Sequence, residues 1–423
     1  MFVVILQTVL VFSCARVLLE GNREDRNIRI SNPYKGTVSI PFEFINNLVV
    51  IPVRINNSPP LKFILDTGVG RTLITELGVN QAFEINYQEN IQLNGLGSGS
   101  SLPALVSRDN KIYLDEIEGE NHTVVFLLEG RFNLSNFMGT QVNGLIGYDI
   151  FENFIVEIDY DREFLYLHDP DYFKKEFEER KRSDSWVYLP FEVIENKLYT
   201  NAQIVQSDSS VIDVKLLIDS GASHTVFLYP NTDKEIKISP NLIYSYLGTG
   251  LNGEILGKIS RVKQINLAGF EIENPIVSYP DDDAIEQAIL RSDRNGSIGA
   301  DILKRFDIIY SYQDSGMLIR KNNSFKDSFR YNASGIEIIT PVLDLPYYLI
   351  SEVRENSPAA EAGLKKGDIL LWVETKKSFE YSLNELIDIF HSVDEKNISL
   401  IVQRETEKLR FIVKLKNELS IID

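Results

Sequence analysis

Short apolar runs that alternate with polar residues dominate the chain from about residue 28 onward, and turns rich in Asn, Gly and Pro separate them. The segments 38–44 and 48–53 combine alternation with β-branched residues, which is the pattern of half-buried β-strands. The dipeptide Asn46-Asn47 supplies the turn between them. The pattern therefore predicts a mainly β protein built from short strands.

Three segments follow a helical pattern instead. Segment 169–183 is highly charged and carries Phe173 and Phe177 at i, i+4 spacing, which predicts a connecting helix with one apolar contact stripe. Segment 357–370 indicates a short helix, a Gly stop, a turn and a strand. In segment 382–390 the apolar positions lie on one helical face. The last two segments predict a separate C-terminal domain.

The chain also contains an internal repeat with a period of roughly 150 residues, which indicates a duplicated unit. Four landmarks occur twice in the same order. They are Pro41-Phe42-Glu43 and Pro190-Phe191-Glu192, Asp66 and Asp219, Leu96-Gly97-Ser98-Gly99 and Leu247-Gly248-Thr249-Gly250, and Asn143-Gly144-Leu145-Ile146-Gly147 and Asn295-Gly296-Ser297-Ile298-Gly299. The repeat predicts two all-β lobes at residues 30–170 and 185–322.

The most informative landmark is a carboxylate that ends an apolar run in each lobe. The two copies are Phe63-Ile64-Leu65-Asp66-Thr67-Gly68 and Leu216-Leu217-Ile218-Asp219-Ser220-Gly221. Two adjacent carboxylates do not both ionise easily, so a pair holds one proton and supplies both an acid and a base. The simpler interpretation, two solvent-facing turn aspartates, does not account for their matched place in the repeat.

These motifs together resemble the aspartic proteases, most closely two retropepsin-like acid-protease β-barrel lobes in tandem. The resemblance implies that Asp66 and Asp219 are catalytic and meet at a pseudo-two-fold axis. Thr67 and Ser220 would hydrogen-bond across the lobe interface, and Gly68 and Gly221 would let the backbone approach the carboxylates. The strands that contain Leu145-Ile146-Gly147 and Ser297-Ile298-Gly299 would support the Asp loops. No metal and no other cofactor is required.

The same resemblance places a β-hairpin flap in each lobe, where glycines would let it close over an extended peptide. The candidate flap residues are Gly97, Ser98 and Gly99 in the first lobe and Gly248, Thr249 and Gly250 in the second. Pepsin-like flaps usually carry a tyrosine, but none occurs between 96 and 102, whereas Tyr244 and Tyr246 precede the second hairpin. The sequence leaves open which flap closes.

Other motifs favour structural interpretations. Residues 248–253 match a GxGxxG pattern, but a strand-like alternation follows them instead of the helix that dinucleotide binding needs. His224 lies in none of the spacings typical of a metal site or a catalytic triad. Asp149 and Asp301 each precede an apolar stretch, as a helix cap would.

The segment 357–370 resembles the core of a PDZ domain of the circularly permuted bacterial kind, which implies a domain at 335–418. The resemblance places the carboxylate-binding loop before a strand at 345–353 and a helix beside it. A peptide tail would add to that edge as a strand. The predicted peptide-binding residues are Tyr347, Tyr348, Leu349 and Ile350. The usual Gly of the loop is replaced by Pro346-Tyr347-Tyr348.

Composition limits the classes of partner. A net charge of −18 argues against a nucleic-acid surface. The single cysteine, Cys14, excludes a disulfide framework. It lies beside the apolar run 2–12, so residues 1–20 fit a signal peptide or a lipoprotein signal. We expect export, to the periplasm, to a lipid anchor at the cell envelope or to the medium; a buried strand or an anchor helix is the alternative.

The sequence thus predicts an exported aspartic endopeptidase, active as a monomer on polypeptide substrates, with a PDZ domain that docks peptide tails or regulates cleavage. Two alternatives stay open. The lobes are a catalytically inactive, protease-like scaffold that binds peptides, or the segment 23–34 occupies the cleft until it is removed.

Overall fold

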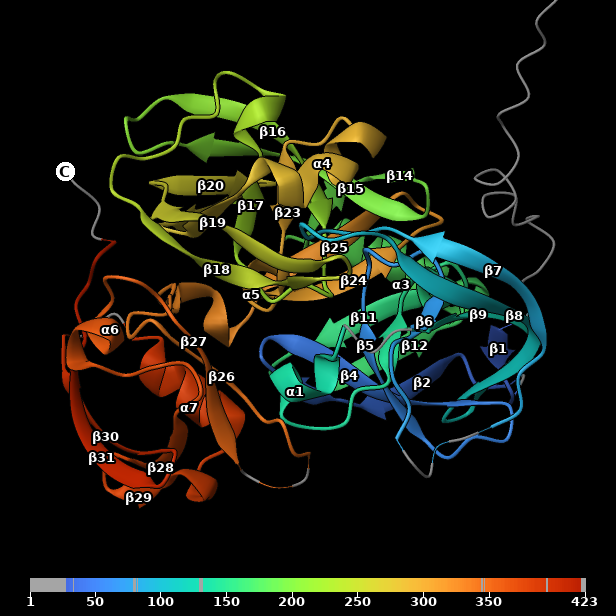
Figure 1. Cartoon of the computed structure of the whole chain (residues 1–423). Helices are drawn as coiled ribbons and strands as arrows, with labels where there is room; N and C mark the ends of the chain where they lie inside the picture. Colours follow the sequence, from blue (N-terminus) through green and yellow to red (C-terminus); the bar gives the residue numbers. More distant parts are fainter. Residues whose placement is uncertain are drawn as a thin grey trace, which may run out of the picture.

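The computed structural model describes residues 28–32, 34–78, 81, 83–128, 132–343, 345, 347–392 and 395–419. Two β lobes lie side by side, and a smaller C-terminal domain lies next to the first lobe and the lobe interface (Figure 1). The predicted signal segment, residues 1–20, lies outside the described residues. No helix in the described part of the chain is long and apolar enough to cross a membrane.

The first lobe is a nine-stranded sheet that closes into a six-stranded barrel, because the long strand β8 pairs with both β4 and β9. The strands alternate buried and exposed residues, as the sequence pattern predicts. In spatial order they are β1 (Ile28–Ile30), β9 (Ile117–Leu127), β6 (Thr72–Ile74), β10 (Gly144–Ile146), β5 (Leu61–Leu65), β4 (Leu48–Ile55), β8 (Leu102–Leu114) and β7 (Tyr87–Leu93), with β3 (Glu43–Ile45) on β4.

The second lobe repeats this topology, but the long strands β8 and β9 each correspond to two shorter strands. The counterpart of β8 is divided into β19 and β20, which pair with β22 and β15, so the ring closes through the chain at residues 262–263. The ten strands are β18 (Ile243–Gly250), β19 (Gly253–Arg261), β22 (Ile276–Pro280), β17 (Val226–Leu228), β23 (Gly296–Ile298), β16 (Val211–Ile218), β15 (Lys197–Val205), β20 (Gln264–Leu267) and β21 (Phe270–Glu273), with β14 (Glu192–Ile194) on β15.

A third sheet joins the lobes, since β11 of the first pairs antiparallel with β24 of the second. Its six strands are β13 (Val187–Pro190), β25 (Gly316–Lys321), β24 (Phe306–Ser311), β11 (Ile155–Asp159), β12 (Phe164–His168) and β2 (Thr37–Pro41). The predicted connecting helix is α3 (Pro170–Lys181), and its Phe173 and Phe177 are buried with Trp186 against this sheet. The apolar stripe therefore attaches the linker to the sheet that both lobes share.

The C-terminal domain is a six-stranded sheet with two helices, α6 (Pro358–Ala362) and α7 (Leu383–Phe390), both of which the sequence predicts. Its strands are β26 (Ile336–Ile339), β27 (Tyr348–Val353), β28 (Ile369–Val373), β30 (Asn397–Arg404) and β31 (Glu407–Lys414), with β29 (Lys376–Lys377) on β28.

The prediction that residues 347–350 form the free edge of this sheet is wrong. Strand β27 lies between two neighbours, because Leu349 is paired with Ile339 of β26 and with Ile369 of β28. The edge strand is β26, whose short run Ile336-Glu337-Ile338-Ile339 covers β27.

Short helices complete the fold. They are α1 (Leu134–Met138), α2 (Tyr148–Phe151), α4 (Asp282–Arg291) and α5 (Ala300–Leu303), and the 3-10 turns η1 (Pro230–Thr232), η2 (Asn323–Lys326) and η3 (Ser378–Glu380). One continuous apolar core runs through both lobes and the shared sheet, and a second core fills the C-terminal domain.

Candidate active site

Each repeated Asp follows the end of a central strand in its lobe. Asp66 comes directly after β5, and Asp219 directly after β16. A parallel neighbour, β10 or β23, lies behind each loop, as the sequence predicts. The backbone N–H of Asp66 donates to the carbonyl of Ile146 at 2.8 Å, and that of Asp219 donates to Ile298 at 2.9 Å. The backbone of each aspartate is therefore fixed by hydrogen bonds to a strand of its barrel.

Reciprocal hydrogen bonds across the lobe interface join the two Asp loops. The Thr67 hydroxyl donates to the Ile218 carbonyl at 2.7 Å and accepts from the Ser220 N–H at 3.0 Å. The Ser220 hydroxyl donates to the Leu65 carbonyl at 2.9 Å and accepts from the Thr67 N–H at 3.0 Å. Thr67 and Ser220 are both buried. The predicted contact between them is present, and it fixes one Asp loop relative to the other.

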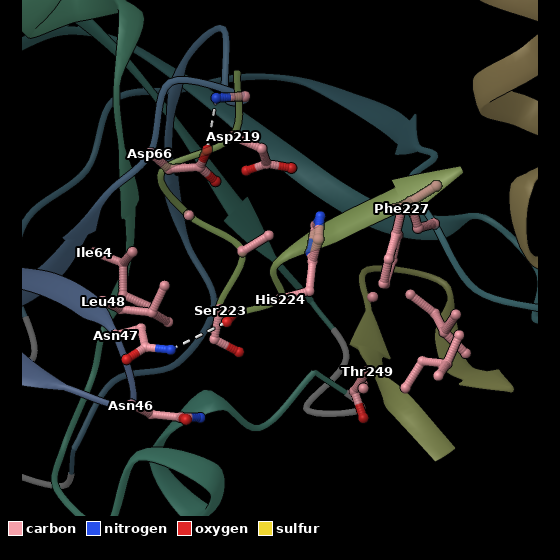
Figure 2. A pocket seen from close by; sticks show the side chains of 18 of the residues that line it. Asn46, Asn47, Leu48, Ile64, Asp66, Asp219, Ser223, His224, Phe227 and Thr249 are labelled. Atoms are coloured by element: carbon pink, nitrogen blue, oxygen red, sulfur yellow. Dashed lines mark hydrogen bonds between the residues drawn. The ribbon is translucent and has the colours of Figure 1, made fainter. Parts of the chain in front are cut away.

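Close approach of the carboxylates requires a glycine at 221 and makes position 68 tight for any other residue. A Cβ on Gly221 would lie 2.1 Å from Cγ of Asp66, a distance that no side chain tolerates. A Cβ on Gly68 would lie 3.0 Å from an oxygen of Asp66 and 3.3 Å from an oxygen of Asp219. The Gly68 N–H donates to Asp66 at 2.6 Å. The two carboxylates therefore meet at these glycines, and Figure 2 shows Asp66 and Asp219 next to each other.

Burial and mutual repulsion keep the pair from ionising fully. Burial, followed by the charge of Asp219, raises the pKa of Asp66 to about 7. Burial also raises the pKa of Asp219, and Arg294 and Lys197 partly offset that effect. Below about pH 7 the pair thus holds one proton. The two titrations belong to the pair, so the proton is not assigned to either residue.

A cleft of about 1280 Å³ runs between the lobes and is lined by both aspartates. The two hairpin tips meet above it. The N–H of Gly99 donates to the carbonyl of Asn252 at 2.7 Å, and the N–H of Asn252 donates to Leu96 at 2.8 Å. A Cβ on Gly99 would lie 2.3 Å from the Asn252 oxygen, so this contact needs a glycine. Both predicted flaps therefore take part in one joined cover.

The predicted flap residues lie differently in the two lobes. Gly248, Thr249 and Gly250 are the last residues of β18 and line the cleft. In the first lobe, the cleft is lined by Asn94, Gly95 and Leu96, whereas Gly97, Ser98 and Gly99 pack against the second hairpin and α4.

Two further repeated aspartates are structural, as the sequence predicts. Asp149 is buried and accepts from the N–H of Thr72 at 2.8 Å and from its hydroxyl at 2.9 Å. Asp301 accepts from the hydroxyl of Thr225 at 2.8 Å. The expected cap position is wrong in detail, because glycines hold the N-caps of α2 and α5 and both aspartates lie in the first turn. They tie the strand after each Asp loop to a short helix.

His224 lines the cleft, but its ring already contacts other side chains of the second lobe. Its ring stacks on Phe227 at 3.8 Å between centroids, and Nε2 lies 2.9 Å from the hydroxyl oxygen of Ser297. Burial lowers the pKa of His224 to about 3, so the ring is neutral. In the described part of the chain, no group of three or more His, Cys, Asp or Glu side chains is arranged to hold a metal ion.

Two cleft residues that the sequence analysis did not single out lie close to the aspartates. Lys197 begins β15, and Arg294 lies just before β23. Both line the cleft, and both act electrostatically on Asp219. Alignment of the two repeats could have identified them, because each is a charged residue where the first lobe has an apolar one. The matching residues of the first lobe are Leu48 and Val142.

The same cleft extends to the C-terminal domain, where it is lined by β26 and α7. The first lobe contacts both elements. The N–H of Thr340, just after β26, donates to the Asn136 carbonyl of α1 at 2.9 Å. The Asn384 side chain of α7 accepts from the Asn46 N–H at 3.0 Å and donates to the Phe44 carbonyl at 3.1 Å. The groove between β26 and α7 therefore opens toward the aspartates.

The fold and the site define a bilobed protein with a shared aspartate pair. Comparison with known families agrees: a model described as aspartyl protease matches residues 51–150 and 205–302, and one described as PDZ domain matches residues 349–404. The chain thus carries two retropepsin-like aspartyl protease domains followed by a PDZ domain.

One similar solved structure is the aspartic proteinase from Irpex lacteus, at 12% identity and a TM-score of 0.46, with 69% of this chain and 99% of that chain covered. No curated protein sequence matches the chain.

We predict that Ser220→Ala weakens the lobe interface. The substitution leaves the buried N–H of Thr67 without an acceptor, which costs about 1–3 kcal/mol. Thermal and urea unfolding measure the loss. Ser223→Ala is the matched control, since its hydroxyl has no hydrogen bond within the described residues, and we expect a change within about 0.5 kcal/mol. Equal stability of the two variants would contradict a structural role for the reciprocal bonds.

Proposed function

We propose that this protein is an aspartic endopeptidase in which Asp66 and Asp219 activate a water molecule against a peptide bond. The observation that carries the proposal is the buried carboxylate pair itself. It lies in a large cleft at the meeting point of two lobes, and reciprocal hydrogen bonds hold it. One chain supplies both carboxylates, so the catalytic unit is a monomer.

In the proposed mechanism, the ionised carboxylate removes a proton from water as the oxygen attacks the peptide carbonyl carbon. The protonated carboxyl group donates its proton to the carbonyl oxygen, which gives a neutral diol. Collapse of the diol breaks the C–N bond: the leaving nitrogen takes a proton from the protonated carboxyl group, while the ionised carboxylate takes one from a diol hydroxyl, so the acid product forms and the pair again holds one proton. The joined hairpin tips exclude bulk water and hold the substrate strand over the carboxylates.

The groove of the PDZ domain offers the substrate polypeptide a second binding site, in addition to the cleft at the aspartates. The three N–H groups at the start of its groove are already bonded within the chain: Ser334 to the carbonyl of Phe390, Gly335 to the side chain of Asn332, and Ile336 to the hydroxyl of Ser334. A terminal carboxylate needs free N–H donors. The groove is thus suited to an internal extended segment rather than a free C-terminus, and it adds substrate contacts away from the scissile bond.

We predict that Asp66→Asn and Asp219→Asn each abolish cleavage of a decapeptide library, with kcat/KM at least about a thousandfold lower, because an amide supplies neither the acid nor the base. Mass spectrometry of the products measures the effect. Asp208→Asn, an exposed surface position, should cleave as the wild type does. If wild type binds peptides but cleaves none, the protein is a binding scaffold and the proposal fails.

The pH dependence follows from the raised pKa of Asp66. Above about pH 7 the pair loses its shared proton, so kcat/KM should fall by up to tenfold per pH unit.

The stability of the fold should also fall as the pH rises. A carboxyl group whose folded pKa exceeds its ordinary value stabilises the fold at low pH, and this contribution is lost as the pH rises through about 7. The melting temperature of Asp66→Asn, relative to that of the wild type, should therefore rise steadily from pH 4 to pH 8. A pH-independent difference would contradict the burial of the pair.

For the PDZ groove, we predict that Ile387→Asp raises KM for casein severalfold and leaves cleavage of a decapeptide unchanged, because only the longer chain reaches α7. Ile412→Asp, on the exposed face of β31, is the control and should change neither value. Amidating the C-terminus of a long substrate peptide should leave its KM unchanged. A large loss on amidation would show instead that the groove binds a carboxylate.

A further inference from the structure

The pockets on the two sides of the aspartate pair are equivalent in backbone but not in charge. Leu48 begins β4 and pairs with β3, and Lys197 begins β15 and pairs with β14 in the same way. Val142 and Arg294 each precede an Asn whose side-chain oxygen accepts the N–H of a residue on the Asp-bearing strand, at 2.9 Å and 2.8 Å. Lys197 and Arg294 are thus the pseudo-symmetric counterparts of two apolar residues.

The first-lobe pocket is apolar in all of these positions. Leu48 and Val142 are buried in one apolar cluster with Ile64 and Met138, and all but Val142 line the cleft. The second-lobe pocket contains Lys197 and Arg294 beside Tyr199 and Asp219. The two sides of the pair therefore present different chemistry to a bound peptide.

The two cations lack partners of their own. Arg294 is only 7% exposed, and its Nε has no hydrogen-bond partner. Its guanidinium lies 5.5 Å from the ring centre of Tyr229. Within the described residues, neither Arg294 nor Lys197 forms a hydrogen bond or an ion pair. Asp293 is already paired with Lys215 at 2.9 Å. An arginine does not lose its proton in a protein, and a buried charge without a partner destabilises the fold.

The aspartates alone do not neutralise this pocket. When the pair holds one proton it carries one negative charge, whereas Arg294 carries one positive charge and Lys197 adds a second when it is protonated, although burial and Arg294 lower the pKa of Lys197. Glu195 also lines the cleft, but its side chain is exposed and screened by water. With Lys197 protonated, about one positive charge is left over in the working state of the pair, which matches one carboxylate from a substrate.

We propose that the second-lobe pocket binds an acidic side chain of the substrate next to the scissile bond, with Arg294 and Lys197 as its specificity-determining residues. This rests on the proposed endopeptidase function and names its substrate class. A carboxylate can accept two parallel hydrogen bonds from the Arg294 guanidinium, and the Lys197 ammonium adds a point charge. On the other side of the bond, the apolar pocket takes an apolar side chain.

Binding tests the pocket separately from catalysis. The ligands are positional-scanning decapeptides that carry either Glu or Gln at each position in turn, titrated into the full-length Asp66→Asn variant so that no turnover interferes. We expect Glu to be preferred over Gln at one position by about 10- to 100-fold in Kd. Adding Arg294→Val, which installs the first-lobe residue, should reduce the ratio to about threefold or less, whereas Arg294→Lys retains part of it.

Two controls make the outcome decisive. Lys197→Leu should lower the Glu-to-Gln ratio as well, whereas Val142→Ala, in the buried cluster of the first lobe, should leave it unchanged. A ratio near one in the parent protein, or one that survives Arg294→Val, would overturn the proposal and leave the cations as groups that act only on the aspartates. Cleavage by the wild-type protein is scored separately: a Glu preference without cleavage supports this pocket and contradicts the endopeptidase function.

Discussion

The reciprocal hydrogen bonds between Thr67 and Ser220 are the constraint on which the rest of the structure depends. Each hydroxyl reaches the main chain immediately before the opposite aspartate, so the bonds position the two carboxylates relative to each other rather than within one lobe. The shared sheet, in which β11 pairs with β24, brings the lobes together, and α3 packs on that sheet. Without this arrangement each Asp would be an ordinary carboxylate at the end of a strand.

The duplication repeats the backbone faithfully and varies the side chains where function requires it. The Asp loop, its supporting strand and the Thr–Asp contact each occur once in each lobe. The cover is formed by unlike hairpins, since Gly248 and Gly250 line the cleft whereas Gly97 and Gly99 pack against α4 and the second hairpin. The pockets differ most, since Leu48 and Val142 in one lobe correspond to Lys197 and Arg294 in the other.

Much of this could be predicted from the sequence, because repeated motifs at a constant spacing report tertiary contacts indirectly. The aspartate pair is of this kind, whereas the Thr67–Ser220 contact follows from the family resemblance and the helix predicted at 169–183 follows from the i, i+4 spacing of its two Phe residues. The edge strand β26 was missed because strand pairing depends on which short apolar run reaches the edge, and local pattern does not encode that. Lys197 and Arg294 were missed because a charge beside a strand normally faces water, and only the fold shows that both point into the cleft.

The central claim is that one chain forms one complete site from two lobes. Calorimetric titration with the transition-state analogue pepstatin, combined with light scattering, tests it most directly. The account predicts one inhibitor bound per chain, a complex with the mass of a monomer, and loss of binding when either Asp66 or Asp219 is replaced by Asn. Binding of one inhibitor per two chains, or binding that survives both substitutions, would contradict it.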